Sequence, residues 1–110
     1  MAQPSAVALR RKRRALARKL PCLENLLRGS LLEAYKRCGR PNCRCQRGRG
    51  HGPKHYLTVS HSGEQPQKEY VPQTFREQVN RYLDNYRQAK EILKEICRIN
   101  CELLCRREPL

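Results

Sequence analysis

Three cysteines and a histidine lie close together in one short segment of the chain, as Cys38, Cys43, Cys45 and His51. Thiolate sulfur and imidazole nitrogen are ligands that Zn²⁺ prefers, and four such atoms complete its tetrahedral shell. We therefore predict that these four residues bind zinc, with His55 as an alternate ligand. Bound thiolates would also offset the repulsion among the arginines of the same segment.

The same segment also allows a structure without metal. The spacing Cys38-x4-Cys43-x-Cys45 lacks the Cys-x2–4-Cys pair that is usual in zinc sites. Residues 40–42 read Arg-Pro-Asn, which is typical of a turn. Such a turn would leave Cys38 and Cys43 facing each other as packed thiols, so the sequence supports both alternatives.

The chain is strongly basic, with a formal net charge of +14 over 110 residues. Residues 1–28 carry a net charge of +7, residues 29–72 carry +5 and residues 73–110 carry +2. Positive charge concentrated in one part of a protein attracts polyanions. We therefore expect the first two segments to face a polyanion and the last segment to have an architectural role.

The expected polyanion is a nucleic acid, DNA rather than RNA. Residues of the N-terminal arm and the cysteine segment are predicted to contact phosphates: Arg10, Arg11, Lys12, Arg13, Arg14, Arg40, Arg44, Arg47, Arg49 and Lys54. Tyr56 and Tyr70 are candidate groups for base stacking. The alternatives are a basic surface that only aids solubility and tyrosines that fill the core.

The elements that would position these residues follow from local patterns. Residues 55–61 alternate at period two and are rich in β-formers, and residues 67–71 form a returning strand. Residues 30–37 favour a third strand, although Ser30 and Glu33 also fit the capping box of a helix. We predict a small antiparallel hairpin or three-stranded sheet.

A long helix is predicted from Thr74, which would cap it together with Glu77, to about Arg107. The fold class is therefore α+β, with a cysteine-rich loop within the sheet region. Three segments are expected, namely a basic arm with a short helix at 1–28, the loop and hairpin at 29–72, and the long helix at 73–110.

The long helix has apolar residues at alternating spacings of three and four, which is the pattern of a coiled coil. The predicted partner is a second copy of the chain, through Val79, Tyr82, Tyr86, Leu93, Ile96, Asn100 and Leu103, with Ala89 in the same seam. Alternatively the helix packs on the hairpin and on residues 22–28 of its own chain. Cys97, Cys101 and Cys105 are expected to form a partly buried stripe, and Cys22 to be a small core residue.

A set of motifs resembles a small uncharacterised bacterial and archaeal domain family over about residues 28–104. The motifs are Arg28-Gly29-Ser30-Leu31, Tyr35, Cys38-Gly39, Pro41, Cys43-Arg44-Cys45, His51-Gly52-Pro53, Tyr56-Leu57 and Tyr70-Val71-Pro72, followed by the long helix. The resemblance implies a loop and fold that form a unit, and an association of some members with mobile elements or transposase-like proteins. It supplies no catalytic residue. Lys54 and His55 stand where the family has aromatic residues.

Several function classes have no support in the sequence. No stretch resembles a secretory signal or approaches the ~18 apolar residues of a membrane helix. We therefore expect a cytoplasmic protein without a membrane partner, whose seven cysteines are reduced or metal-bound. A Cys43 or Cys45 nucleophile with His51 as its base would lack an orienting group, so no enzymatic activity is expected. The alternative function is a structural module that dimerises through the long helix without binding nucleic acid.

Overall fold

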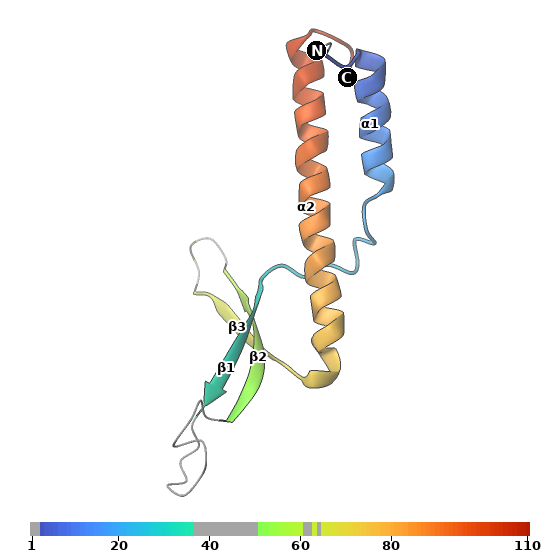
Figure 1. Cartoon of the computed structure of the whole chain (residues 1–110). Helices are drawn as coiled ribbons and strands as arrows, with labels where there is room; N and C mark the ends of the chain where they lie inside the picture. Colours follow the sequence, from blue (N-terminus) through green and yellow to red (C-terminus); the bar gives the residue numbers. More distant parts are fainter. Residues whose placement is uncertain (1–2, 37–50, 61–62, 64) are drawn as a thin grey trace, which may run out of the picture. The chain divides into compact units, whose positions relative to one another are not determined.

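The protein has an α+β fold with a three-stranded antiparallel sheet and a long C-terminal helix, which confirms the predicted fold class. The computed structural model describes residues 3–36, 51–60, 63 and 65–110. Its elements in chain order are α1 (Ala6–Arg18), β1 (Ser30–Lys36), β2 (His51–Val59), β3 (Gln67–Val71), the 3-10 turn η2 (Gln73–Phe75) and α2 (Arg76–Cys105) (Figure 1).

The chain forms two compact units. The first, which we call the helical unit, consists of Met1–Leu26 and Asp84–Leu110, and the second, the sheet unit, consists of Leu27–Leu83. The start of α2 belongs to the sheet unit and its remainder belongs to the helical unit. The first and last of the three segments expected from the sequence thus contribute to one unit.

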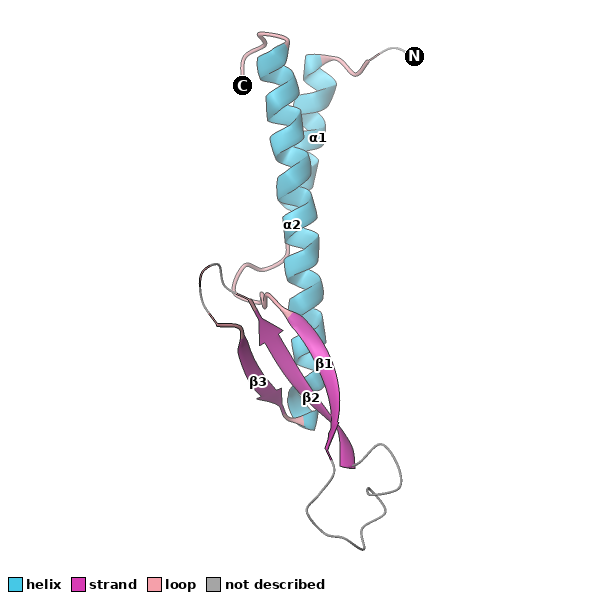
Figure 2. Ribbon diagram, turned by 90° about the vertical axis from the view of Figure 1, so that its left-hand side faces the viewer, coloured by secondary structure: helices cyan, strands magenta, loops and turns pink. Residues whose placement is uncertain are grey.

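In the sheet unit, β2 is the central strand and pairs antiparallel with β1 and with β3 (Figure 2). The predicted strand over residues 30–37 is confirmed as β1, and the capping box that would have begun a helix at Ser30 does not form. The predicted strand over residues 67–71 is confirmed as β3. The register is regular except for an irregularity between Ala34 and Lys36.

One face of this sheet forms a core with the first turns of α2. Leu57, Val71 and Leu83 are buried there, with partly buried side chains packed around them, namely Leu27, Leu31, Val59 and Val79. The alternation of apolar and polar residues along β2 places Leu57 on this face, because successive side chains of a strand point to opposite sides.

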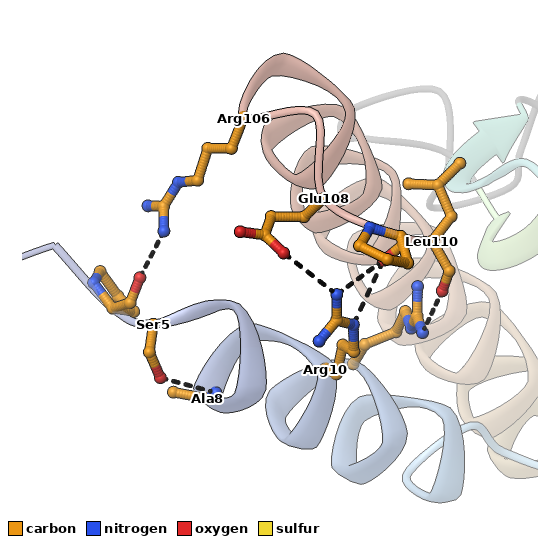
Figure 3. Close-up of polar contacts among 9 residues, drawn as sticks. Ser5, Ala8, Arg10, Arg106, Glu108 and Leu110 are labelled. Atoms are coloured by element: carbon orange, nitrogen blue, oxygen red, sulfur yellow. Dashed lines mark hydrogen bonds and ion pairs between the residues drawn. The ribbon is translucent and has the colours of Figure 1, made fainter.

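In the helical unit, α1 and the C-terminal part of α2 run side by side in opposite directions (Figure 1). Leu9, Ile99 and the fully buried Leu103 form the core between them, with Ala6 and Leu16 packed against it. The Ser5 hydroxyl accepts a hydrogen bond from the Ala8 backbone N–H at 3.1 Å and caps α1 (Figure 3).

The two ends of α2 differ from the sequence prediction. Instead of the box formed by Thr74 and Glu77, a 3-10 turn precedes the helix with Pro72 at its N-cap and no capping hydrogen bond from a side chain. Pro72 fixes its own φ, and its carbonyl accepts from the Phe75 N–H at 2.9 Å, so the backbone satisfies this donor itself. At the other end, the predicted helix extends to about Arg107, whereas the observed helix ends at Cys105.

The C-terminal end of α2 is closed by a Schellman motif. Arg107 adopts a left-handed conformation, with φ of 57°. The Glu108 N–H donates to the Leu103 carbonyl and the Arg107 N–H to the Leu104 carbonyl, each at 2.9 Å. These bonds satisfy carbonyls that the helix itself leaves unpaired.

The buried residues of α2 lie on more than one face of the helix. Its buried residues are Leu83, Ala89, Ile92, Ile99 and Leu103, of which only Ala89 and Leu103 belong to the predicted seam. Leu83 lies in the core of the sheet unit, whereas Ala89, Ile92, Ile99 and Leu103 are spaced three, seven and four residues apart and form one stripe of heptad spacing in the helical unit. Leu93, also predicted in the seam, is 53% exposed.

The cysteine predictions outside the loop were wrong. Cys22, Cys97, Cys101 and Cys105 are all exposed free thiols. A step of four residues advances about 40° around the helix, so residues 97, 101 and 105 leave the buried stripe that Ile99 and Leu103 occupy.

Gly29 provides a test of the sheet unit. Its φ is +138°, and a Cβ at this position would lie 2.5 Å from the Thr58 carbonyl oxygen. Because that atom belongs to the backbone of the central strand, Gly29→Ala should lower the free energy of unfolding by more than about 1 kcal/mol. Gly63→Ala is the matched control, since Gly63 has φ of +76° but nothing within 4 Å. Equal losses in denaturant unfolding would contradict the role of the close contact.

Candidate nucleic-acid interface

Much of the predicted site lies outside the described residues. This applies to Cys38, Cys43, Cys45, Arg40, Arg44, Arg47 and Arg49. His51 begins β2, but its side chain is not described. Within the described part of the chain, no three His, Cys, Asp or Glu side chains form a group that could hold a metal ion. The zinc prediction and the four loop arginines therefore stay predictions.

His55, the alternate ligand, is buried in the sheet unit. It is 7% exposed, and its Nε2 lies 3.2 Å from Oε1 of Glu33 on the paired strand. Its Nδ1 is also buried and has no hydrogen-bond partner among the described residues. One ring nitrogen of His55 is thus already engaged by a carboxylate.

The basic residues of α1 fall into two groups, and the first group binds the C-terminal part of the helical unit. Arg10 donates through Nε and Nη2 to the Pro109 carbonyl at 3.2 and 2.8 Å, and its Nη2 lies 3.7 Å from Glu108 (Figure 3). Lys12 Nζ lies 3.5 Å from Glu95. These cations are therefore engaged by acceptors of their own chain.

Arg13 belongs to the same group. Its Nη1 donates to Oδ1 of Asn100 at 2.6 Å, and its Nη2 donates to the Leu110 carbonyl at 3.0 Å. The Asn100 side chain, which the heptad pattern placed in a seam between copies, therefore has a partner within its own helical unit. A charged donor makes this a strong hydrogen bond.

The second group consists of Arg11 and Arg14, together with Arg18 one turn further on. All three are exposed, and within the described residues none makes a hydrogen bond or ion pair. Spacings of three and four residues place them on one face of α1. Arg11 and Arg14 also line a hollow with Val7, Arg10 and Arg13. We call Arg11, Arg14 and Arg18 the outer arginine stripe.

Arg18 was not among the predicted contacts, although the four-residue step from Arg14 could have revealed it. Lys54, which was predicted, lies exposed on β2. Lys68 on β3 was missed, because its proximity to Tyr56 arises only from the pairing of two strands.

The outer arginine stripe has no counter-charge on its own helix. The α1 sequence contains no acidic residue, whereas four cations in or just after α2 pair with an acid three or four residues earlier. These pairs are Asp84–Arg87, Glu91–Lys94, Glu95–Arg98 and Glu102–Arg106. Like charges one turn apart destabilise a helix. An anion bound to the outer arginine stripe would remove that repulsion.

The fold is that of a small α+β protein whose N-terminal helix presents to solvent arginines that have no partner among the described residues. The sequence matches the domain of unknown function DUF6788 over residues 7–81, and the chain belongs to this family. The expected membership of an uncharacterised domain family is thereby confirmed, and the match includes nearly all of α1 and the whole sheet. Comparisons with curated proteins and with solved structures gave no match. Among the described residues, no helix combines the length and the apolar character needed to cross a membrane.

The division of the α1 cations predicts opposite effects on stability. Arg10→Ala with Arg13→Ala removes the hydrogen bonds to Pro109, Asn100 and Leu110, and should lower the free energy of unfolding of the helical unit by about 1–3 kcal/mol. Arg11→Ala with Arg14→Ala should leave it unchanged or raise it slightly, since repulsion is relieved. Thermal unfolding followed by circular dichroism measures both. If both variants lost the same free energy of unfolding, the observed hydrogen bonds of Arg10 and Arg13 would contribute nothing to stability.

Proposed function

We propose that this protein is a non-enzymatic DNA-binding protein that contacts phosphates through the outer arginine stripe. The observation that supports the proposal is the position of Arg11, Arg14 and Arg18 on one exposed face of a helix that contains no acidic residue. The resemblance in the motifs further suggests an accessory factor related to mobile elements.

The spacing of the stripe suits a nucleic-acid backbone. Arg18 follows Arg11 by two helical turns, which is about 10 Å along a helix that rises 1.5 Å per residue. Duplex DNA carries one negative charge per about 1.7 Å of its axis, so several phosphates lie within that length. Each guanidinium can bind phosphate oxygens through two parallel N–H groups. The net charge of +14 adds long-range attraction.

Basic residues outside the helical unit are proposed as further, separate phosphate contacts. Lys54 is exposed on β2, and Arg40, Arg44, Arg47 and Arg49 are proposed to contact phosphates from the loop. Arg10, Lys12 and Arg13 contribute charge while they hold the C-terminal residues, so we assign them a positioning role in the helical unit.

The test removes three charges from α1 and compares the effect with the removal of three charges from α2. Changing Arg11, Arg14 and Arg18 together to Ala should reduce the slope of log affinity against log salt, by about 0.9 for each duplex phosphate that the variant no longer neutralises. The control variant changes Arg87, Lys94 and Arg98 to Ala. These three cations are paired with acids in the same helical unit. It lowers the net charge equally but should keep the slope. Equal slopes for the two variants would reject the stripe as an interface.

We also propose that Cys38, Cys43, Cys45 and His51 bind zinc and thereby order the loop. The support is the chemistry of the donor set, since thiolates and imidazole suit Zn²⁺. The reduced protein should contain about one equivalent of zinc, and Cys43→Ser should abolish it. Cys97→Ser, at an exposed thiol on α2, is the control and should retain the metal. If wild-type protein without metal has the same unfolding curve as protein supplied with zinc, this part of the proposal is rejected.

A second candidate function is a structural module that dimerises through α2. The specific observation in its favour is the exposure of Leu93 and Leu104, each 53%, with the exposed Cys97 and Cys101 between them. Residues of the predicted seam that are already buried, such as Leu103, would instead hold the helical unit together. A stable dimer that binds no DNA at low salt would favour this function over the first.

A further inference from the structure

The sheet unit has a second face that no described core covers. The register places Leu32, Tyr56 and Tyr70 opposite one another on β1, β2 and β3. Leu57 and Val71 are buried on the core face, so residues one position away along the strands lie on the other face. Leu32 is 45% exposed and Tyr70 is 54% exposed. A row with apolar and aromatic side chains therefore crosses all three strands on this face.

The tyrosines of this row are already arranged as an aromatic pair with a cation. The Tyr56 and Tyr70 ring centroids are 5.8 Å apart with an interplanar angle of 65°, an edge-to-face contact. Lys68 Nζ lies 4.5 Å from the centroid of the Tyr56 ring, within the range of a cation–π interaction. The pair leaves Tyr70 with more than half of its surface exposed.

All charges of this face in the described strands are positive. Lys68 and Thr58 are paired on one side of the row, and Ala34 and Lys54 on the other. The acidic residues Glu33 and Glu69 alternate onto the opposite face, opposite His55 and Leu57. An exposed aromatic row flanked by two lysines complements a ligand that has both flat rings and negative charge.

We propose that this face binds single-stranded DNA, with bases stacked on Tyr70 and along the Leu32–Tyr56–Tyr70 row and phosphates paired with Lys54 and Lys68. We refer to these five residues as the stacking face. The proposal rests on the proposed DNA-binding function and adds its substrate class. Stacking needs an open base, because the rings of a duplex are covered by their neighbours, whereas the outer arginine stripe reads only phosphates. Neither interaction uses a ribose 2′-hydroxyl.

The size of the stacking face limits how much DNA it holds. Neighbouring strands are about 4.8 Å apart, so a row across three strands spans roughly 10 Å. That length accommodates about two or three nucleotides, fewer than the roughly four or more per site of OB-fold single-strand binders. The stacking face therefore distinguishes single strands from duplexes, while charge elsewhere supplies much of the affinity.

The experiment compares a labelled oligothymidylate with a duplex of the same length, using the full chain. Tyr70→Ala should weaken single-strand binding by about tenfold and duplex binding by less than about twofold. Tyr70→Phe should keep both affinities, because the ring remains. Gln67→Ala, an exposed uncharged position on the opposite face of β3, is the matched control and should also keep both.

Intrinsic fluorescence gives a second readout that does not depend on affinity alone. The chain has five tyrosines and no tryptophan, so tyrosine emission can be followed directly. Base stacking should quench part of this emission, and the quenching is measured for each variant relative to its own free protein. The loss of quenching should be smaller in Tyr70→Phe than in Tyr70→Ala. Lys68→Gln should lower the salt slope for the single strand by about 0.7.

The outcomes separate this inference from the proposed function. If Tyr70→Ala and Leu32→Ala bind single strands as tightly as Gln67→Ala does, the stacking face is rejected while binding through the outer arginine stripe stands. If wild-type protein binds no DNA at low salt, the proposed function fails and the inference with it. Binding of oligouridylate that is tighter by about tenfold or more would overturn the assignment to DNA. Sedimentation showing a wild-type dimer that Tyr70→Ala converts to monomer would overturn it in favour of a second copy of the chain.

Discussion

Electrostatic repulsion within α1 is the constraint around which the helical unit is built. Residues 9–20 hold seven cations, and like charges one turn apart oppose helix formation. The burial of Leu9 and Leu16 against Ile99 and Leu103 favours the helix. Hydrogen bonds from Arg10 and Arg13 to backbone carbonyls beyond α2, and to Asn100, remove part of the repulsion. The α1 helix is therefore stabilised by residues of the opposite end of the chain.

The positions of the hydrogen-bond acceptors separate arginines of α1 that bind their own chain from arginines that are exposed to solvent. Arg10 and Arg13 end on acceptors of their own chain, and Arg11, Arg14 and Arg18 end in solvent within the described structure. The sheet unit repeats this division in another form. Its core face carries Leu57, Val71 and both acidic residues of the paired strands, and its other face carries lysines and open aromatic rings.

Local patterns were sufficient to predict the three strands and the long helix α2. Period-two alternation identified the sheet, and the absence of Gly and Pro identified α2, because both signals depend only on neighbouring residues. The 3-10 turn at Gln73 was missed, because the backbone itself replaced the cap that Thr74 and Glu77 offered. The seam of α2 was only partly predicted, since Ile92 and Ile99 are buried in place of Leu93 and Asn100, which follow them by one residue, and heptad spacing alone does not decide between these two faces.

The candidate site was less predictable than the fold. Composition indicated a basic helix, but the contact of Arg13 with Asn100 joins residues that no local pattern links. The same holds for Lys68 and Tyr56, which strand pairing brings together. Composition indicates the sign of the charge on a surface more readily than it identifies which charged side chains there have no partner in their own chain. Of the four predicted zinc ligands, the three cysteines lie outside the described residues and His51 begins β2.

The exposed thiols of α2 have a consequence for the redox chemistry of the protein. Side chains four residues apart on a helix have Cβ atoms about 5–6 Å apart, whereas a disulfide needs about 3.5–4.5 Å. Cys97, Cys101 and Cys105 therefore cannot bridge to one another while the helix is intact. Under oxidising conditions each of them can form a mixed disulfide with a small thiol, such as glutathione, or with a cysteine outside this row. The helix thus carries a row of separate conjugation points, one turn apart, on which mixed disulfides or thiol-specific probes can be placed without closing a ring.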